Sequence, residues 1–265
     1  MKKLMTILAM FAMVGFVSCQ KPADNSKKND EQNEEQKPDD QKPDDQKPDD
    51  NPPASTVVEL TIDGNFEDWA GLKKENYSQT YGDDEALKPA LTHCKVYATA
   101  SKVYVYVEWD EEGLGEDLSW IPFHCYINTD GDEATGGFSD QFSDACSDVL
   151  LEGGVYSEGA ICSYWSGGYP WIGEANGSGW GWAPDTDNIF PEVSPTEGAG
   201  VPGKYEFSID RKMFADAGFP IADEFSIGFD IQNSGWDSVG VLPSTSPSED
   251  NANGTLPSLK VKTIK

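Results

Sequence analysis

The sequence predicts an all-β fold: an antiparallel β-sandwich of jelly-roll or immunoglobulin-like size with one short helix, preceded by a disordered acidic linker. Two observations support this prediction. Apolar and polar residues alternate over several short segments, which is typical of strands with one buried face. Gly, Pro and Asp residues separate these segments at short intervals, as turns do in antiparallel sandwiches. We expect three parts, at residues 1–18, 19–53 and 54–265.

Residues 1–18 have the pattern of an export signal. Lys2 and Lys3 precede an apolar run, Leu4–Val17, that is shorter than the roughly 20 residues a spanning helix needs. Phe16-Val17-Ser18-Cys19 resembles the lipobox of bacterial lipoproteins, which implies cleavage before Cys19 and lipid on that cysteine. Gln20 resembles no inner-membrane retention signal. We therefore expect a lipid anchor in the outer membrane of a Gram-negative bacterium, facing the cell surface, with an ordinary cleaved signal as the alternative.

Residues 19–53 are expected to form a disordered spacer. From Gln20 to Pro53 there is no Val, Ile, Leu or aromatic residue, so nothing offsets the entropy of ordering the chain. The sequence QKPDD occurs three times in succession, at 36–40, 41–45 and 46–50. Proline favours extended conformers and paired aspartates repel one another, so the segment is expected to be stretched.

Residues 54–265 form a strongly acidic domain. They contain 36 acidic and 11 basic residues, which gives a formal charge of −25. Such a surface repels nucleic acid and anionic lipid, so contact with the membrane is expected through the lipid anchor only. Cations and neutral glycans fit this charge, and adaptation to salt or simple solubility is the plainer explanation.

The strands of this domain are predicted from their alternation. The clearest pair is Lys95–Thr99 with Lys102–Trp109, across a turn at Ala100-Ser101. One short helix is expected near Arg211–Ala217, with Asp210 as N-cap and Gly218 as stop. The other expected strands are Val57–Ile62, Pro122–Asn128, Val149–Leu151, Val155–Tyr164, Tyr205–Ile209, Phe225–Ile231, Val239–Leu242 and Leu259–Ile264.

Four cysteines remain besides Cys19, in a compartment that permits disulfides. Cys94 and Cys125 fall on apolar strand faces, where buried thiols are at least as good an explanation as a bridge. Cys146 and Cys162 lie symmetrically about Gly154, and Gly153-Gly154 would make a good hairpin turn. A hairpin folded there would place Cys146 opposite Cys162, which makes a disulfide between them a candidate.

A run of oxygen-bearing side chains suggests a calcium site. Asn128-Thr-Asp130-Gly-Asp132-Glu-Ala-Thr-Gly136-Gly137 starts like an EF-hand loop but lacks the glycine and the final glutamate that such a loop requires. A loop that follows a strand is the better interpretation, with a structural ion and a plain acidic turn as the alternative. The candidate ligands are Asn128, Asp130, Asp132, Asp140 and Asp148, with Asp144 and Glu152 close in sequence.

Three stretches of the domain together resemble a known family. Asp63-Gly-Asn-Phe-Glu-Asp68-Trp69 is similar to the opening of family 9 carbohydrate-binding modules and related DOMON-like sandwiches, and Asn128–Gly137 and Asp148–Gly153 are similar to later segments of the same family. The resemblance covers about residues 57–265. It implies a β-sandwich that binds calcium and clamps a sugar between aromatic rings. The family's two clamping tryptophans do not align one to one here, and the cysteines are not part of its pattern.

Aromatic residues are concentrated in a glycine-rich stretch between Tyr164 and Trp182. Indole faces stack on the flat C–H faces of sugars, and nearby carboxylates and amides bind hydroxyl groups. A loop folded onto the sandwich as a cover is the alternative. Trp69 is expected in the core, Trp236 is expected to supply a partner ring from a strand-end loop, and Trp120 is left undecided. The candidate ligand-binding residues are Tyr164, Trp165, Tyr169, Trp171, Glu174, Asn176, Trp180, Trp182 and Trp236.

The resulting expectation is a non-catalytic surface lipoprotein that binds an oligosaccharide or polysaccharide. A structural or protein-binding surface domain, in a surface protein complex, is the main alternative. Glu108 and Glu112 have the spacing of laminarinase-like glycoside hydrolases, which makes a retaining glycosidase a further alternative, although Glu111 breaks the pattern. Haem binding through Met213 and His93 or His124 has no support from spacing.

Overall fold

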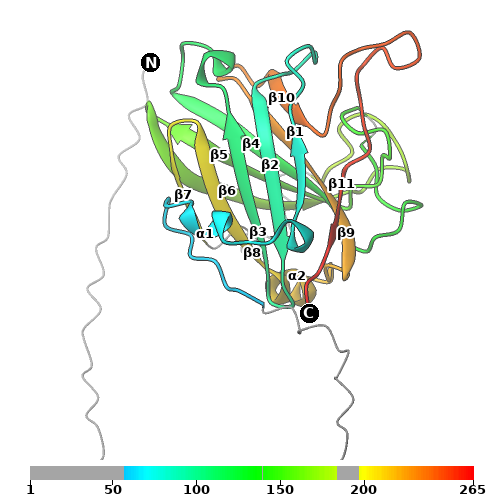
Figure 1. The fold of residues 1–265 in the computed structure, drawn as a ribbon. Helices are drawn as coiled ribbons and strands as arrows, with labels where there is room; N and C mark the ends of the chain where they lie inside the picture. The colour runs from blue at the N-terminus through cyan, green and yellow to red at the C-terminus, as the bar shows by residue number, and fades with distance from the viewer. Residues whose placement is uncertain (1–56, 139, 184–196) are drawn as a thin grey trace, which may run out of the picture. The chain divides into compact units, whose positions relative to one another are not determined.

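The computed structural model describes residues 57–138, 140–183 and 197–265. The predicted signal, Cys19 and the spacer lie outside the described residues. The fold of the described residues is an antiparallel β-sandwich, as the sequence predicted (Figure 1). The helices are short: α1 (Glu67–Ala70), η1 (Lys74–Asn76), η2 (Glu111–Leu114) and α2 (Arg211–Asp216).

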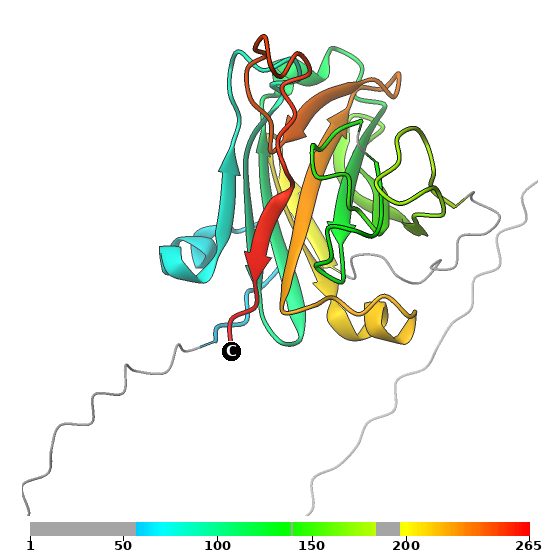
Figure 2. The same ribbon diagram turned by 90° about the vertical axis from the view of Figure 1, so that its right-hand side faces the viewer.

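Two antiparallel sheets make the sandwich, and Figure 2 shows them nearly edge-on. We call the five-stranded sheet, with order β1-β2-β3-β8-β7, sheet A. We call the sheet with order β10-β9-β4-β5-β6 sheet B, and β11 pairs with β9 beside β10. Sheet A consists of β1 (Ser78–Tyr81), β2 (Leu91–Ala98), β3 (Lys102–Trp109), β8 (Lys204–Asp210) and β7 (Glu197–Val201). Sheet B consists of β10 (Ser238–Leu242), β9 (Glu224–Gln232), β4 (Trp120–Asn128), β5 (Val149–Ser157) and β6 (Ala160–Pro170), with β11 at Leu259–Lys262.

The core lies between the sheets and follows the alternation of the strands. On β3, Val103, Val105 and Val107 point into it, and Phe123, Cys125 and Ile127 do the same from β4. Cys94 of β2 also lies in this core, and both thiols are free and fully buried. Burial raises the pKa of each thiol well above its ordinary value, because a thiolate is poorly solvated there.

The opposite face of sheet A is also covered, which explains the Asp63–Trp69 motif. The Glu206 carboxylate accepts hydrogen bonds from the amides of Asp63 (3.1 Å) and Gly64 (2.8 Å), and from the indole nitrogen of Trp69 (2.7 Å). Trp69 is buried among aromatic rings of β2 and β3, as the sequence predicted. Burial raises the pKa of Glu206, although all three donors act to lower it. The motif therefore fastens the start of the domain to sheet A through one buried carboxylate.

Two sequence predictions are corrected by the fold, and one is confirmed. Val57–Ile62 is not a strand, because this segment bonds to side chains such as the Tyr97 hydroxyl and not to a neighbouring strand. Gly153-Gly154 is not a turn: it lies inside β5, and the hairpin turns at Glu158-Gly159. The helix prediction is confirmed, since the Asp210 side chain accepts from Lys212 N (2.7 Å) at the start of α2.

The proposed Cys146–Cys162 disulfide depended on that turn and is wrong. Cys162 lies on β6 with its sulfur 3.4 Å from the carbonyl oxygen of Gly154, whereas Cys146 precedes β5. The observed register pairs Tyr156 with Ile161 and Val149 with Pro170, so the two cysteines lie toward opposite ends of the hairpin. Both thiols are free.

Candidate functional site

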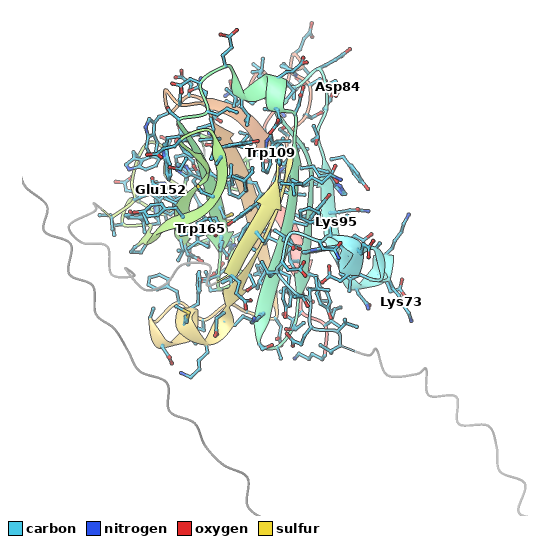
Figure 3. The ribbon with its side chains drawn as sticks, turned by 90° about the vertical axis from the view of Figure 1, so that its left-hand side faces the viewer. Lys73, Asp84, Lys95, Trp109, Glu152 and Trp165 are labelled. Carbon is cyan, nitrogen blue, oxygen red and sulfur yellow. The ribbon has the colours of Figure 1, made fainter. Side chains whose placement is uncertain are left out.

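A row of three titratable side chains crosses the outer face of sheet B. His124 of β4 pairs in register with Glu152 of β5 on one side and with Asp230 of β9 on the other. Their neighbours Phe123, Leu151 and Ile231 point into the core, so the alternation of each strand directs the polar residues outward. Figure 3 shows Glu152 on the outer side of sheet B, with Trp165 and Trp109 nearer the interior.

Hydrogen bonds fix the orientation of the histidine. Gln232 Nε2 donates to Asp230 Oδ2 (3.0 Å), since a carboxylate only accepts, and the same nitrogen lies 3.4 Å from His124 Nδ1. Nδ1 also lies 3.2 Å from the Tyr126 hydroxyl, and the two contacts together hold the ring in place. Nε2 lies 3.4 Å from Glu152 Oε2, an ion-pair distance without the alignment of a hydrogen bond.

The two carboxyl groups of the row respond differently to burial. Burial raises the pKa of Asp230, and its contacts with His124, Ser238 and Gln232 only reduce that effect. Burial also acts to raise the pKa of Glu152, but His124 and Ser166 more than offset it and the pKa is lowered. At neutral pH Glu152 is therefore an ionised acceptor beside the histidine.

Two buried polar atoms of this row have no hydrogen-bond partner among the described residues: His124 Nε2 and Gln232 Oε1. The side chain of His124 is only 1% exposed. Buried polar groups in native proteins are nearly always satisfied by protein, water or ligand. Both atoms are buried, so the polar group that the row presents to a molecule above it is the Glu152 carboxylate, the most exposed of the four side chains.

Trp180 and Trp236 flank this row and are both exposed, by 62% and 52%. Their ring centroids lie 6.4 Å and 6.5 Å from the His124 ring, at interplanar angles of 50° and 47°. Exposed indoles are uncommon on a soluble surface and often mark a contact site. We call the two tryptophans with His124, Glu152, Asp230 and Gln232 the aromatic site.

The turn between β9 and β10 presents Trp236. Trp236 has φ +66°, a left-handed conformation that is unfavourable for a bulky residue. Asn233 holds the turn closed, because its Oδ1 accepts from the amides of Gly235 (2.9 Å) and Asp237 (3.0 Å). Backbone strain of this kind concentrates at functional positions.

A second tight turn presents Trp180. The amide of Gly179 donates to Asp140 Oδ2 (2.6 Å), and Ile172 N donates to the carbonyl oxygen of Gly181 (2.8 Å). The edge of the indole meets Phe138 at a centroid distance of 6.1 Å, and Phe138 stacks on the buried Tyr126. Packing beneath the ring thus fixes the position of Trp180.

Most of the other aromatic residues predicted to bind ligand do not belong to the aromatic site. Tyr169 and Trp182 are buried in a cluster with Tyr126 and Phe142, and Trp171 packs against it. Trp165 points into the core, against Phe123 and Phe207. For these rings the alternative interpretation, a cover packed on the sandwich, is the correct one. Tyr164 is exposed on the same sheet but farther along it.

Two polar candidates from the same stretch are also placed differently. Asn176 Nδ2 donates to the carbonyl oxygens of Glu133 and Ala145, both at 3.0 Å, so its amide ties loops together. Glu174 is exposed, and its carbonyl oxygen accepts from the Trp171 indole at 2.9 Å. Asp230 and Gln232 were not among the residues predicted from the sequence. Their alternation on β9 gives the signal, since polar residues and Gly228 alternate there with apolar residues of the core.

The predicted calcium ligands do not all converge. Asn128 Oδ1 accepts from Gly131 N (2.8 Å) and Asp148 Oδ2 from Thr129 N (2.7 Å), so both shape the same turn. Burial raises the pKa of Asp148, and the nearby Asp130 charge acts in the same direction. Asp140 instead supports the Trp180 turn and leaves the candidate ligand set. Calcium at Asn128, Asp130, Asp132 and Asp148 stays a prediction, and among the described residues no three His, Cys, Asp or Glu side chains form a metal-binding group.

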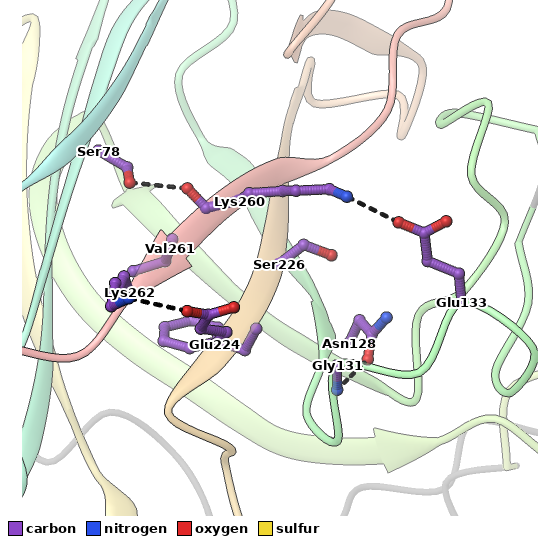
Figure 4. Close-up of a pocket in the computed structure, with 10 residues that line it drawn as sticks. Ser78, Asn128, Gly131, Glu133, Glu224, Ser226, Lys260, Val261 and Lys262 are labelled. Carbon is purple, nitrogen blue, oxygen red and sulfur yellow. Dashed lines mark hydrogen bonds and ion pairs between the residues drawn. The ribbon is translucent and has the colours of Figure 1, made fainter.

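A pocket of about 230 Å³ lies beside this turn (Figure 4). Lys260 pairs with Glu133 at 2.8 Å and Lys262 with Glu224 at 3.0 Å, so the charges in its wall are already matched. None of the tryptophans is among the described residues that line it. It is therefore separate from the aromatic site.

The premise for a carboxylate pair at Glu108 and Glu112 is wrong. Strand β3 ends at Trp109, and Glu112 lies in η2, so the two do not share a strand face. Glu108 accepts from the Tyr106 hydroxyl and lies 3.6 Å from Lys204 Nζ. The haem candidates lie on three different elements, Met213 on α2, His93 on β2 and His124 on β4.

No protein-family model matches this chain, and no curated protein matches it significantly. The functional argument therefore rests on the side chains of the aromatic site. Within the part of the chain that the structure describes, no helix is both long enough and apolar enough to cross a membrane.

Proposed function

We propose that this protein is a non-catalytic, lipid-anchored carbohydrate-binding protein of the outer membrane, and that the aromatic site binds the sugar. One observation carries the proposal: two exposed tryptophans flank a polar row whose partly exposed Glu152 carboxylate can accept hydrogen bonds. Indole rings supply dispersion contact to the C–H face of a pyranose, and the row supplies hydrogen bonds to its hydroxyl groups.

The charge of the site supports a neutral ligand. Glu152 lies in the row, Asp140 lies at the Trp180 turn, and the domain has a formal charge of −25. A glycan rich in carboxylates or sulfates would be repelled, whereas hydroxyl groups bind well to carboxylate acceptors. Affinity at an open, two-ring site is expected to be about micromolar to millimolar. A structural calcium ion at the Asn128–Asp132 turn remains part of the proposal.

The proposal is tested by titrating the full chain with neutral mono- and disaccharides and following tryptophan fluorescence and heat of binding. Trp180→Ala and Trp236→Ala are each expected to weaken binding about tenfold or more, because each ring supplies roughly 1–2 kcal/mol of contact. Ile172→Ala is the matched control, since this exposed apolar side chain lies in the same loop as Trp180 but outside the aromatic site.

Sugar-specific saturation that is lost in both tryptophan variants and kept in the control would support the proposal. Absence of binding by any neutral sugar would contradict it. A structural or protein-binding surface domain would then be the better account.

A further inference from the structure

A second pair of aromatic rings lies on the same face of sheet B. Trp120 begins β4 and Tyr164 lies on β6, with ring centroids 5.7 Å apart and an interplanar angle of 72°. Tyr164 is 55% exposed and Trp120 is half-buried. Neither ring belongs to the buried clusters that form the core or cover the sheet.

The position of Trp120 depends on Gly154 of β5. A Cβ atom at residue 154 would lie 2.4 Å from the Trp120 ring, so the indole rests directly on the glycine backbone. The strand register is shifted between Ile121 and Pro122 on β4, and on either side of Gly153-Gly154 where β5 pairs with β6. Such bulges redirect side chains and are frequent beside binding sites.

This pair adjoins the aromatic site along β5. Glu152 and Gly154 are two residues apart on one strand face, which corresponds to about 7 Å. From β9, which leads into the Trp236 turn, to β6, which carries Tyr164, the sheet crosses β4 and β5. Three inter-strand steps of about 4.8 Å give a span of about 14 Å, longer than one pyranose ring.

We infer that Trp120 and Tyr164 form a second sugar subsite, so that the protein binds an internal stretch of a neutral glycan chain across sheet B and not a single terminal sugar. This inference rests on the proposed function. The rings of the second subsite would stack on a sugar unit next to the one held at His124, and the absence of a side chain at Gly154 lets the Trp120 ring lie directly on β5.

The inference is tested by measuring the affinity of the full chain for cello-, xylo-, manno- and laminari-oligosaccharides of one to six units. One of these oligosaccharide series is expected to bind the unmodified protein. Within that series, affinity is expected to rise about tenfold as the chain grows beyond the shortest ligand bound, and then to level off. Tyr164→Ala is expected to abolish that rise while leaving the affinity for the shortest ligand unchanged. Tyr164→Phe, which keeps the ring, is expected to retain it.

Two further variants separate this inference from the proposed function. Trp236→Ala should weaken binding at every chain length, and Tyr81→Ala, which removes an equally exposed tyrosine from sheet A, should change nothing. A length-dependent rise that survives in Tyr164→Ala, or no rise in the unmodified protein, would overturn the second subsite and leave the proposed function standing. No binding at any length would overturn both.

Discussion

Asp230 has no exposed surface, yet it lies one strand away from His124 in the aromatic site. Its neighbours Gln232 and Ser238 donate hydrogen bonds to it, and burial still raises its pKa. A carboxyl group whose pKa is higher in the folded state takes up its proton more readily there than in the unfolded chain. Its contribution to stability is therefore lost as the pH rises from the unfolded pKa, near 3.8, through the folded pKa.

We expect Asp230→Asn to gain stability relative to the unmodified protein as the pH rises from about 4 to 7. The reason is that ionisation of the buried Asp230 carboxyl group opposes folding, whereas asparagine does not ionise. A pKa difference of one between the two states corresponds to about 1.4 kcal/mol. The measurement is the free energy of unfolding by denaturant across this range.

Asp223→Asn is the matched control with the opposite sign. Asp223 is exposed, and the Lys265 hydrogen bond lowers its pKa, so its contribution is present at neutral pH and lost as the pH falls through the folded pKa. The stability of the unmodified protein should therefore increase relative to that of Asp223→Asn as the pH rises. The same sign in both variants would contradict the assignment for Asp230.

At the scale of single residues, sequence reasoning identified side chains better than it assigned their roles. Trp69, Trp180 and Trp236 were expected where the structure has them, in the core or exposed beside a site. The prediction that Trp171 and Trp182 bind ligand was wrong, because a glycine-rich loop can fold back and bury its own rings. Asp230 and Gln232 were missed because a buried polar row depends on which strands lie side by side.

Among the elements, the β9–β10 turn shows most clearly how an exposed tryptophan is held in place. It holds one exposed tryptophan in a left-handed conformation, and the Asn233 side chain closes it with two backbone hydrogen bonds. An asparagine that bonds to the backbone two residues on is a common way of stabilising a turn.

We expect Asn233→Ala to weaken sugar binding about three- to tenfold, with a loss of stability of about 1 kcal/mol, because the turn loses the bonds that hold Trp236. Isothermal titration of the Asn233→Ala variant with the sugar bound by the unmodified protein would measure this. Asn251→Ala is the control, since Asn251 closes a comparable turn with Thr255 that contributes nothing to the aromatic site. Equal effects of both variants on affinity would argue against a positioning role for Asn233.

The bounds of a strand were predictable where apolar and polar residues alternate strongly. The prediction failed where packing against other strands determines the structure. The bounds of β3 match the prediction, because Val103, Val105 and Val107 alternate with Tyr104, Tyr106 and Glu108. Gly153-Gly154 looked like a turn, but the glycines serve β5 by making room for Trp165 on one face and Trp120 on the other. Those contacts come from the two flanking strands β4 and β6, so local turn propensity could not reveal them.

At the scale of the whole molecule, fold class was predictable and strand order was not. Short alternating segments specify an antiparallel sandwich, but they do not say that β3 pairs with β8 or β4 with β9. The row formed by His124, Glu152 and Asp230 exists only through that order. The negative charge of the domain was readable from composition alone, and it restricts the ligands of any site on this surface.

Anchorage is a whole-molecule property that can be tested directly. In a Gram-negative host, we expect the full chain to incorporate labelled palmitate and to sediment with outer membranes. Cys19→Ala is expected to abolish labelling and to move most of the protein to other fractions, because in the proposed anchor the Cys19 thiol is the acceptor of the lipid.

Cys162→Ala is the control, since it removes a partly exposed thiol from the folded domain. Labelling that persists in Cys19→Ala, or is absent from the unmodified protein, would contradict the anchor. The first result would point to another acceptor, and the second to an ordinary cleaved signal.

The left-handed backbone at Trp236 has a consequence for how the sequence can drift. Glycine or asparagine would adopt that conformation at lower cost, so selection for a stable fold alone would replace the tryptophan. Descendants that keep a tryptophan at this turn would record selection for what the ring touches, while descendants that lose it would record that the ligand no longer matters. One position can thus distinguish inheritance of a scaffold from inheritance of a function.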